Sequence, residues 1–330
     1  MNYSLEWRTW IVCVLLMLSG LALADDVYWN NAADGNWNDA GNWSTGNVPA
    51  AGDNVFIDLA GDYTVTLDVD ITVLSLEVGA ASGTQTLAAA GRTITLTNGG
   101  TVNGNGVLSL SATTVNSAVT LNNNGTIYLL NSNNIAAALS NAGTISAQNA
   151  GNQITGPLTT LSNSVIEISI TTFANVNLTV ANGFTNNGII RFTNTYSNNN
   201  LNSVLTVSSG SLVNAAGATI EQVATAGNPT LNAALDNQGT FLLSGNRDLT
   251  LTSPGGDHIN TGAITVDAGR TLNVSNSNME LASGGSVSGG GVAFSNATVT
   301  FSDPVIPAVP LSFTGSTLAG SSTVQNNGTL

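Results

Sequence analysis

A short phrase, apolar-x-Asn-x-Gly with an apolar residue two places further on, recurs through the second half of this chain. Its clearest copies are 121–127 (LNNNGTI), 139–145 (LSNAGTI), 184–190 (FTNNGII), 235–241 (LDNQGTF) and 324–330 (VQNNGTL). Self-similarity of this kind predicts a solenoid, in which each repeat buries its apolar face against its neighbours. A chain with such a repeat has few other folds open to it.

The glycines of the phrase set the length of one coil. Gly217, Gly239 and Gly262 follow one another at steps of about 22 residues, which is typical of one coil of a β-helix with two or three short strands and their turns. The step from Gly143 to Gly188 is near twice this period, and the step from Gly262 to Gly328 is near three times it. Weaker copies are therefore expected at 161–166 and at 285–287.

The segment 63–78 shows the strand pattern most clearly. Apolar residues alternate with polar ones from Tyr63 to Val73, and the apolar phase then shifts by one, to Leu74, Leu76 and Val78. Alternation with a period of two indicates half-buried strands, and the shift predicts a corner after Val73. Helical spacing is not sustained anywhere after residue 24, so we expect an all-β fold.

The phrase contains the residues that a coil corner needs. We expect the flanking apolar residues to point into the stack, where each contributes about 1.5–3 kcal/mol when fully buried. Glycine is expected to supply a positive φ at the corner. Stacking would place the asparagine amides about 4.8 Å apart, where they can bond along the axis. The predicted corner residues are Asn123, Gly125, Asn141, Gly143, Asn186, Gly188, Asn237, Gly239, Asn260, Gly262, Asn326 and Gly328.

One copy departs from the pattern. Ala215 stands two places before Gly217, and Asn214 lies one place earlier. We interpret this as a bulge of one residue.

These observations predict a single-stranded, right-handed parallel β-helix over residues 58–330, with about 22 residues per coil. The rod is expected to be roughly 55–60 Å long at the usual strand spacing. Residues 25–57 are rich in aromatic side chains and are the candidate cap of the N-terminal edge, which would otherwise promote aggregation. Because the last phrase ends at residue 330, we expect the repeat array to be truncated there.

Composition restricts the partners. Lysine is absent, there are 5 arginines against 19 acidic residues, and the formal net charge is −14. Such a surface repels phosphate backbones and anionic headgroups, so we expect neither nucleic acid nor an anionic membrane surface as partner. We expect the protein to be a monomer.

Residues 1–24 are typical of an export signal. Arg8 precedes an apolar stretch at 11–18, and Ala22-Leu23-Ala24 is a small-x-small cleavage sequence. The single cysteine, Cys13, lies inside this segment, so the mature chain would have no disulfide and no cysteine-based metal site. The predicted location is outside the cytoplasm, secreted or on the outer cell surface.

His258 is the only histidine, and it occupies the slot that an apolar residue fills four places before the glycine of other copies. One interpretation makes it a special site. The other, which we favour, is that Ile259 points inward in its place and His258 projects from a loop. Asp257 and His258 are adjacent and no serine elbow accompanies them, so a catalytic triad is not supported.

The acidic residues near the start of the array allow two further hypotheses, a catalytic carboxylate pair and a calcium site. Asp68 and Asp70 are expected on one face of one strand, about 7 Å apart, which suits a glycosidase pair or a solvated outer face. Asp53, Asp58 and Asp62 lie nearby, which leaves calcium open although no known calcium-loop spacing is present. The interpretation that we favour is that these carboxylates lie on a solvated outer face. We expect no cofactor.

Trp29, Trp37 and Trp43 are the only tryptophans after the signal region. Exposed, they could contact carbohydrate by stacking on the apolar faces of sugar rings. Burial under the cap is the interpretation that we favour.

The N-terminal block, with Trp37-x5-Trp43, Pro49 and the segment 52–55 (GDNV), resembles the opening of large secreted bacterial β-helix proteins. These are autotransporter-passenger-like, adhesin-like or β-strand-repeat proteins. The Asn-x-Gly-Thr turns are similar to filamentous-haemagglutinin-type repeats. The resemblance implies a right-handed parallel β-helix, export, and a surface or adhesive role. Host or environmental glycans or cell surfaces are the expected partners. The resemblance carries over no catalytic residue.

We therefore expect a secreted or cell-surface, adhesin-like structural protein without catalytic activity. Two alternatives stay open. One is a carbohydrate-binding module, and the other is a polysaccharide-degrading enzyme, because pectin lyases share the β-helix. A lyase of anionic sugars needs cationic groups at its site, and four scattered arginines without lysine make that site hard to build.

Overall fold

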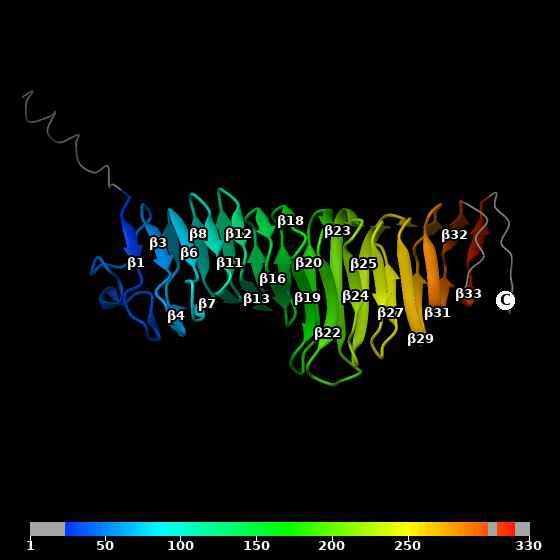
Figure 1. Ribbon diagram of the computed structural model, residues 1–330, viewed down its shortest axis with the longest axis horizontal. Helices are drawn as coiled ribbons and strands as arrows, with labels where there is room; N and C mark the ends of the chain where they lie inside the picture. Colours follow the sequence, from blue (N-terminus) through cyan, green and yellow to red (C-terminus); the bar gives the residue numbers. More distant parts are fainter. Residues whose placement is uncertain (1–23, 303–308, 321–330) are drawn as a thin grey trace, which may run out of the picture.

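The computed structural model describes residues 24–302 and 309–320. The chain winds into a solenoid of about 12 turns with ~21 residues per turn. Figure 1 shows the turns stacked side by side along the long axis, from β1 at one end to β33 near the other. The predicted all-β parallel solenoid and its period are confirmed. The only helical element among the described residues is one 3-10 turn, Ala40–Asn42.

Each turn contributes strands to three columns, and the named strands pair in parallel along each column, with one break in the pairing of the third column. The first column contains β2 (Gly35–Asn36), β4 (Tyr63–Leu67), β7 (Gln85–Ala90), β10 (Gly106–Ser111), β13 (Thr126–Asn131), β16 (Thr144–Ala147), β19 (Val165–Ile170), β22 (Ile189–Asn194), β24 (Thr219–Gln222), β26 (Thr240–Leu243) and the first parts of β29 (Ala263–Ser275) and β31 (Ser286–Ser295).

The second column follows the first around each turn. It contains β5 (Ile71–Val73), β8 (Thr93–Leu96), β11 (Thr114–Ser117), β14 (Asn134–Ile135), β17 (Asn152–Ile154), β20 (Val176–Val180), the first parts of β23 (Asn202–Asn214) and β25 (Asn228–Asn237), β27 (Leu249–Thr252), the second parts of β29 and β31, and β33 (Leu311–Thr314).

The third column completes the turn. It contains β1 (Asp26–Tyr28), β3 (Asn54–Ile57), β6 (Ser75–Val78), β9 (Gly100–Val102), β12 (Leu121–Asn123), β15 (Leu139–Asn141), β18 (Leu158–Thr160), β21 (Phe184–Asn186), the second parts of β23 and β25, β28 (His258–Asn260), β30 (Met279–Leu281), β32 (Thr298–Phe301) and β34 (Thr317–Ala319).

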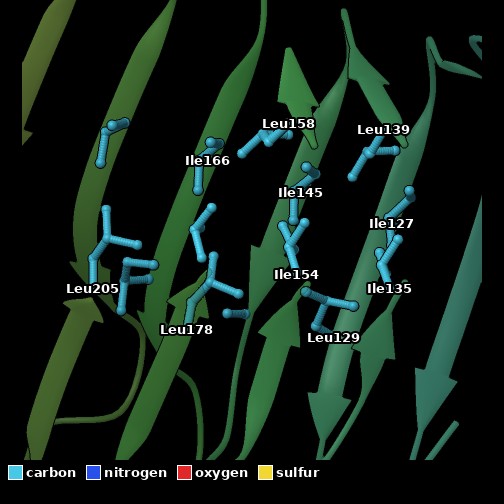
Figure 2. Packing of buried hydrophobic residues seen from close by; sticks show 14 of the residues in the cluster. Ile127, Leu129, Ile135, Leu139, Ile145, Ile154, Leu158, Ile166, Leu178 and Leu205 are labelled. Atoms are coloured by element: carbon cyan, nitrogen blue, oxygen red, sulfur yellow. The ribbon is translucent and has the colours of Figure 1, made fainter. Parts of the chain in front are cut away.

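The core is a set of apolar rows that run along the axis. Strand alternation places every second side chain inside, and the parallel register then stacks each inward residue on its counterpart in the next turn. In the first column, Ile127 pairs in register with Ile145, and Ile145 with Ile166. Figure 2 shows these side chains in line, with Ile135 and Ile154 forming the corresponding row of the second column. All five are fully buried.

Turn length varies along the rod. A short turn separates Ile127 from its partner Ile145, whereas Ile190 pairs with Ile220 across a much longer one. The long step between Gly188 and Gly217 is therefore one enlarged turn. The extra length lies outside the columns, because the core rows continue through it without a break in burial.

The corners of the turns follow the sequence pattern closely. The phase shift after Val73 is a corner, since β5 ends at Val73 and β6 begins at Ser75. The weaker copies also lie in turns of their own, because Val165 pairs with Thr144 and Ser286 pairs with Ala263.

The N-terminal block continues the same architecture. β1 pairs with β3, β3 pairs with β6, and β2 pairs with β4, so residues 26–57 stack directly on the first full turn. The predicted signal segment 1–24, apart from its last residue, lies outside the described residues, as do Asn326 and Gly328.

Candidate functional site

The repeated asparagines line up as a buried row of amides at the corner between the third and first columns. Along the second half of the rod, the Nδ2 of each residue donates to the Oδ1 of the next, at 2.9 Å from Asn186 to Asn214, 2.7 Å from Asn214 to Asn237 and 2.7 Å from Asn237 to Asn260. Asn123 and Asn141 form a shorter run with the same bond at 2.7 Å. We call the row from Asn186 to Asn260 the asparagine ladder.

The amides of the ladder all point the same way. Each Nδ2 group also donates to a main-chain carbonyl across the corner, for example from Asn214 to the oxygen of Thr240 at 3.0 Å. Asn186 and Asn237 make the matching bonds to Thr219 and Ala263. Because only a donor satisfies both contacts, this arrangement fixes each amide orientation, and the aligned bonds reinforce one another.

The row is interrupted at Thr160, which occupies the slot of the asparagine between Asn141 and Asn186. Its hydroxyl donates to the carbonyl of Thr185 at 2.9 Å, and Asn187 Nδ2 donates to the carbonyl of Thr160 at 2.8 Å. Side-chain bonds therefore connect the turns at the place where the seven-stranded part of the third column ends.

The prediction that glycine supplies a positive φ at these corners is wrong. Gly125, Gly143, Gly188, Gly239 and Gly262 are absent from the glycines with positive φ. A Cβ on any of them would instead collide with a carbonyl oxygen of the preceding turn. The N–H of Gly143 approaches the carbonyl of Asn123 at 2.9 Å, so there is no room for a side chain between these layers. The requirement for glycine is steric and comes from the neighbouring turn.

Gly217 is the exception, with a φ of +88° and open space around it. Asn186 pairs with Asn214 and Ile189 pairs with Thr219. The corner between these pairs is formed by 187–188 in one turn and by 215–218 in the next. The second corner is therefore longer by two positions, and the predicted bulge of one residue is wrong.

The three tryptophans are buried in a cluster on the first turn. Trp43 packs edge-on against both Trp29 and Trp37, with ring centroids 5.0 and 4.8 Å apart. Its Nε1 donates to the carbonyl of Trp37 at 2.7 Å, and Trp29 stacks on Tyr63 of β4. In this arrangement the rings are inaccessible to a carbohydrate, which agrees with the interpretation of burial under the cap.

Asp68 and Asp70 do not form a pair on one strand face, so that expectation is wrong. β4 ends before them and β5 begins after them, which places both at a corner. Asp68 accepts from the N–H of Asn38, and Asp70 accepts from the N–H of Thr93, each at 2.9 Å. The two carboxylates therefore bond to neighbours on opposite sides of their own turn and stabilise the stacking.

Nearby carboxylates have similar structural contacts. Asp53 accepts from the N–H of Ala50, and Asp62 accepts from the N–H of Thr84, both at 2.7 Å. Over residues 24–302 and 309–320, groups of three or more His, Asp or Glu side chains that could hold a metal ion are not found.

His258 is fully buried and Ile259 is 39% exposed, so the favoured orientation of this pair is wrong. Asn260 must point inward to join the ladder, and alternation along β28 then places His258 inward and Ile259 outward. The N–H of Leu235 donates to Nδ1 at 3.3 Å, and Nε2 lies 2.8 Å from Ser277 Oγ. Nδ1 is therefore the unprotonated nitrogen, and Nε2–H donates to the serine. Burial lowers the pKa of His258 to about 4.

Most arginines in the described part of the chain connect neighbouring turns. Arg191 lies between Glu167 and Glu221, with N···O distances of 3.2 and 2.5 Å. Arg247 donates to the carbonyl of Gly227 at 2.6 Å, and Arg270 donates to that of Asn246 at 2.8 Å. These cations have structural partners on the outer face of the rod.

The main departure from a regular rod is a pair of loops on adjacent turns. Residues 171–175 connect β19 to β20, and residues 195–201 connect β22 to β23. The loops below β22 extend beyond the outline of the column in Figure 1. We call residues 171–175 and 195–201 the aromatic loops, because Phe173 and Tyr196 meet there at a centroid distance of 6.1 Å, edge to face. Phe173 is 73% exposed and Tyr196 is 39% exposed.

Sequence reasoning missed the aromatic loops. The signals present were the long step before Gly217 and the run 195–200 (TYSNNN), which interrupts strand alternation. An exposed aromatic residue in each of two neighbouring insertions distinguishes this region from the other corners.

Comparison of the chain with protein-family models, with curated proteins and with solved structures gives no match. The part of the chain that the structure describes holds no helix with the length and apolarity that a membrane crossing requires.

Proposed function

We propose that this protein is a secreted or cell-surface, adhesin-like rod that functions by attachment and without catalysis. The observation that carries the proposal is the contrast between a regular column and the aromatic loops on two of its adjacent turns. The column uses its amides and arginines in contacts between turns. The loops instead present Phe173 and Tyr196 to solvent, where a partner can contact them.

Three further features support the proposal. The β-solenoid is the architecture of adhesin-like proteins, although pectate-lyase-like enzymes share it. Residues 1–24 have the composition of an export signal. The net charge of −14 and the absence of lysine disfavour nucleic acid and anionic membranes as partners.

The test is an attachment assay with the whole chain. Beads coated with the protein are counted after washing on epithelial cells, on extracellular matrix and on plant cell wall. We expect retention on at least one surface, and reduced retention when Phe173→Ser and Tyr196→Ser are combined. Control beads are coated with the Tyr28→Ser variant. This substitution removes an aromatic residue of similar exposure, 41%, from another part of the rod.

Absence of retention on every surface would contradict an adhesive role. The same protein is incubated with neutral and acidic polysaccharides, and new reducing ends or unsaturated products are measured. Turnover of any of these polysaccharides by the purified whole chain would establish the enzymatic alternative instead.

A further inference from the structure

The aromatic loops combine four features that together define the chemistry of a ligand: a braced backbone, exposed ring faces, exposed amides and local neutrality. The first is bracing. Thr172 Oγ1 donates to Asn149 Oδ1 at 2.9 Å, and Asn175 Oδ1 accepts from the N–H of Asn202 at 2.9 Å. These bonds connect the first loop to the turns on either side of it.

The second loop is braced in the same way. Asn198 Oδ1 accepts from the N–H of Asn200 at 2.9 Å. Asn228 Nδ2, from the following turn, donates to the carbonyl of Asn199 at 3.0 Å. Asn194 Oδ1, at the base of the loop, accepts from the N–H of Thr225 at 2.7 Å. A loop whose backbone is already ordered loses little conformational entropy on binding.

The aromatic side chains of these braced loops remain in water. Phe173 projects from the first loop and Tyr196 from the second, and the two rings meet edge to face with an interplanar angle of 79°. Their strands, β19 and β22, are paired in register, so the column holds the two loops side by side. An aromatic face of this kind offers an apolar surface that suits the C–H face of a sugar ring.

Exposed amide side chains lie in the same two loops as the rings. Asn199 and Asn200 follow Tyr196 by three and four residues, and Asn175 follows Phe173 by two. An amide side chain offers both donors and an acceptor, which matches the hydroxyl groups of a sugar.

The surroundings of the loops are also nearly uncharged. Between Glu167 and Glu221 the sequence contains one charged residue, Arg191, and both glutamates pair with it. The guanidinium of Arg247, which approaches through Asn228, already donates to the carbonyl of Gly227. On a molecule with a net charge of −14, this neutral region favours a neutral ligand over an acidic one.

We propose that the aromatic loops bind a neutral glycan, with Phe173 and Tyr196 stacking on sugar rings and Asn199 and Asn200 bonding to hydroxyls. This inference rests on the proposed attachment function and names its ligand class. It assigns sugar contact to side chains different from Trp29, Trp37 and Trp43, which are buried.

The test uses the whole chain on an array of immobilised neutral oligosaccharides built from glucose, galactose and mannose, beside sialylated and uronate-containing ones. We expect saturable binding to at least one neutral oligosaccharide. Phe173→Ser and Tyr196→Ser are each expected to weaken it about ten-fold, the effect of losing one well-placed stacking contact. Phe173→Tyr keeps the ring and is expected to retain binding.

The control variant is Tyr28→Ser, because Tyr28 is a similarly exposed tyrosine that stacks on Phe56, away from the loops. It is expected to bind like the unaltered chain, within about two-fold. Thermal unfolding by circular dichroism checks that all variants are folded.

Three results would overturn the inference: no binding to any glycan, binding to acidic glycans alone, or loop variants that bind as tightly as the unaltered chain. Periodate treatment of the surfaces in the bead assay separates this inference from the proposed function. If attachment survives destruction of the sugars, the adhesive role stands and the glycan assignment fails. If beads attach to no surface, the adhesive role itself fails.

Discussion

At the scale of single residues, the corners of this solenoid show that one residue type serves two different purposes. Gly143 lies against the carbonyl of Gly125 in the preceding turn, and its φ is ordinary. Gly217 has open space around it and a φ of +88°. The first position excludes any side chain, and the second excludes residues that disfavour the left-handed region.

This difference predicts opposite responses to asparagine, which tolerates the left-handed region better than alanine does. At Gly217, we expect Gly217→Asn to cost less than about 1 kcal/mol and Gly217→Ala to cost about 1–2 kcal/mol. At Gly143, we expect Gly143→Ala to cost about 2–3 kcal/mol and Gly143→Asn to cost more, because the larger side chain worsens the collision. Chemical denaturation of the four variants measures whether alanine or asparagine is the more destabilising at each position. If asparagine were the less destabilising at both positions, a steric cause at Gly143 would be contradicted.

His258 gives a pH-dependent prediction. Its folded pKa of about 4 lies below the ordinary value of 6.5, so the unfolded chain binds more protons between these values. The neutral ring therefore contributes stability above pH 6.5 that is lost as the pH falls toward 4. The difference between the folded and unfolded pKa values of His258 corresponds to about 3 kcal/mol of unfolding free energy.

The control is His258→Met, since Met279 occupies the same row in the next turn. Unfolding free energies measured between pH 4 and 7 should fall more steeply with decreasing pH in the unaltered chain than in the variant. Equal slopes would show that His258 does not titrate differently in the folded and unfolded states.

At the scale of elements, the asparagine ladder connects strands that belong to successive turns and lie far apart in sequence. An interior member has an amide partner on each side, whereas Asn260 is the last, because Leu281 occupies the slot in the following turn. The buried Oδ1 of Asn123, at the start of the shorter run, has no donor, and Val102 occupies the slot before it. Position in the row therefore determines how many bonds a substitution breaks.

Asn214→Leu is expected to cost about 2–4 kcal/mol, because it removes the two ladder bonds of Asn214, the one from Asn186 Nδ2 and the one to Asn237 Oδ1, inside a buried row. Asn260→Leu is the matched control and leaves only one neighbouring amide without its partner, so about half that cost is expected. Denaturant titration compares the two variants. A cost at Asn260 equal to or above that at Asn214 would contradict the continuity of the ladder.

At the scale of the whole molecule, the rod is a one-dimensional stack in which each turn contacts mainly its two neighbours. The turn 126–143 has equivalents before and after it, since Thr126 pairs with both Val107 and Thr144. Removal of this turn would place Thr144 on Val107 with its register kept.

Deletion of residues 126–143 is therefore expected to give a folded protein that unfolds cooperatively and is shorter by about 4.8 Å. Deletion of residues 126–134 removes half a turn, places β16 and its successors out of register, and is expected to abolish cooperative unfolding. Thermal unfolding by circular dichroism and small-angle scattering measure both effects. Cooperative unfolding of the variant that lacks residues 126–134 would show that the turns are not independent stacking units.

The molecule also shows where sequence reasoning ends. Alternation from Tyr63 to Val73 and the recurring asparagine were sufficient to predict strands, corners and period, because these depend on each residue's own geometry and polarity. The same reasoning placed Asp68 and Asp70 on a strand, since polar residues at a corner and on an exposed face look alike in sequence. Their separation into two corner contacts depends on Asn38 and Thr93, which lie in other turns.

The sequence alone determined that this chain forms a stacked β-solenoid, since a repeat of about 22 residues with alternating apolar positions can bury its core only by layering. Only the tertiary structure decided why glycine occupies the corners, which way His258 points and which insertion presents its aromatic side chains. Those properties depend on distances between consecutive turns, and these distances exist only once the layers are stacked.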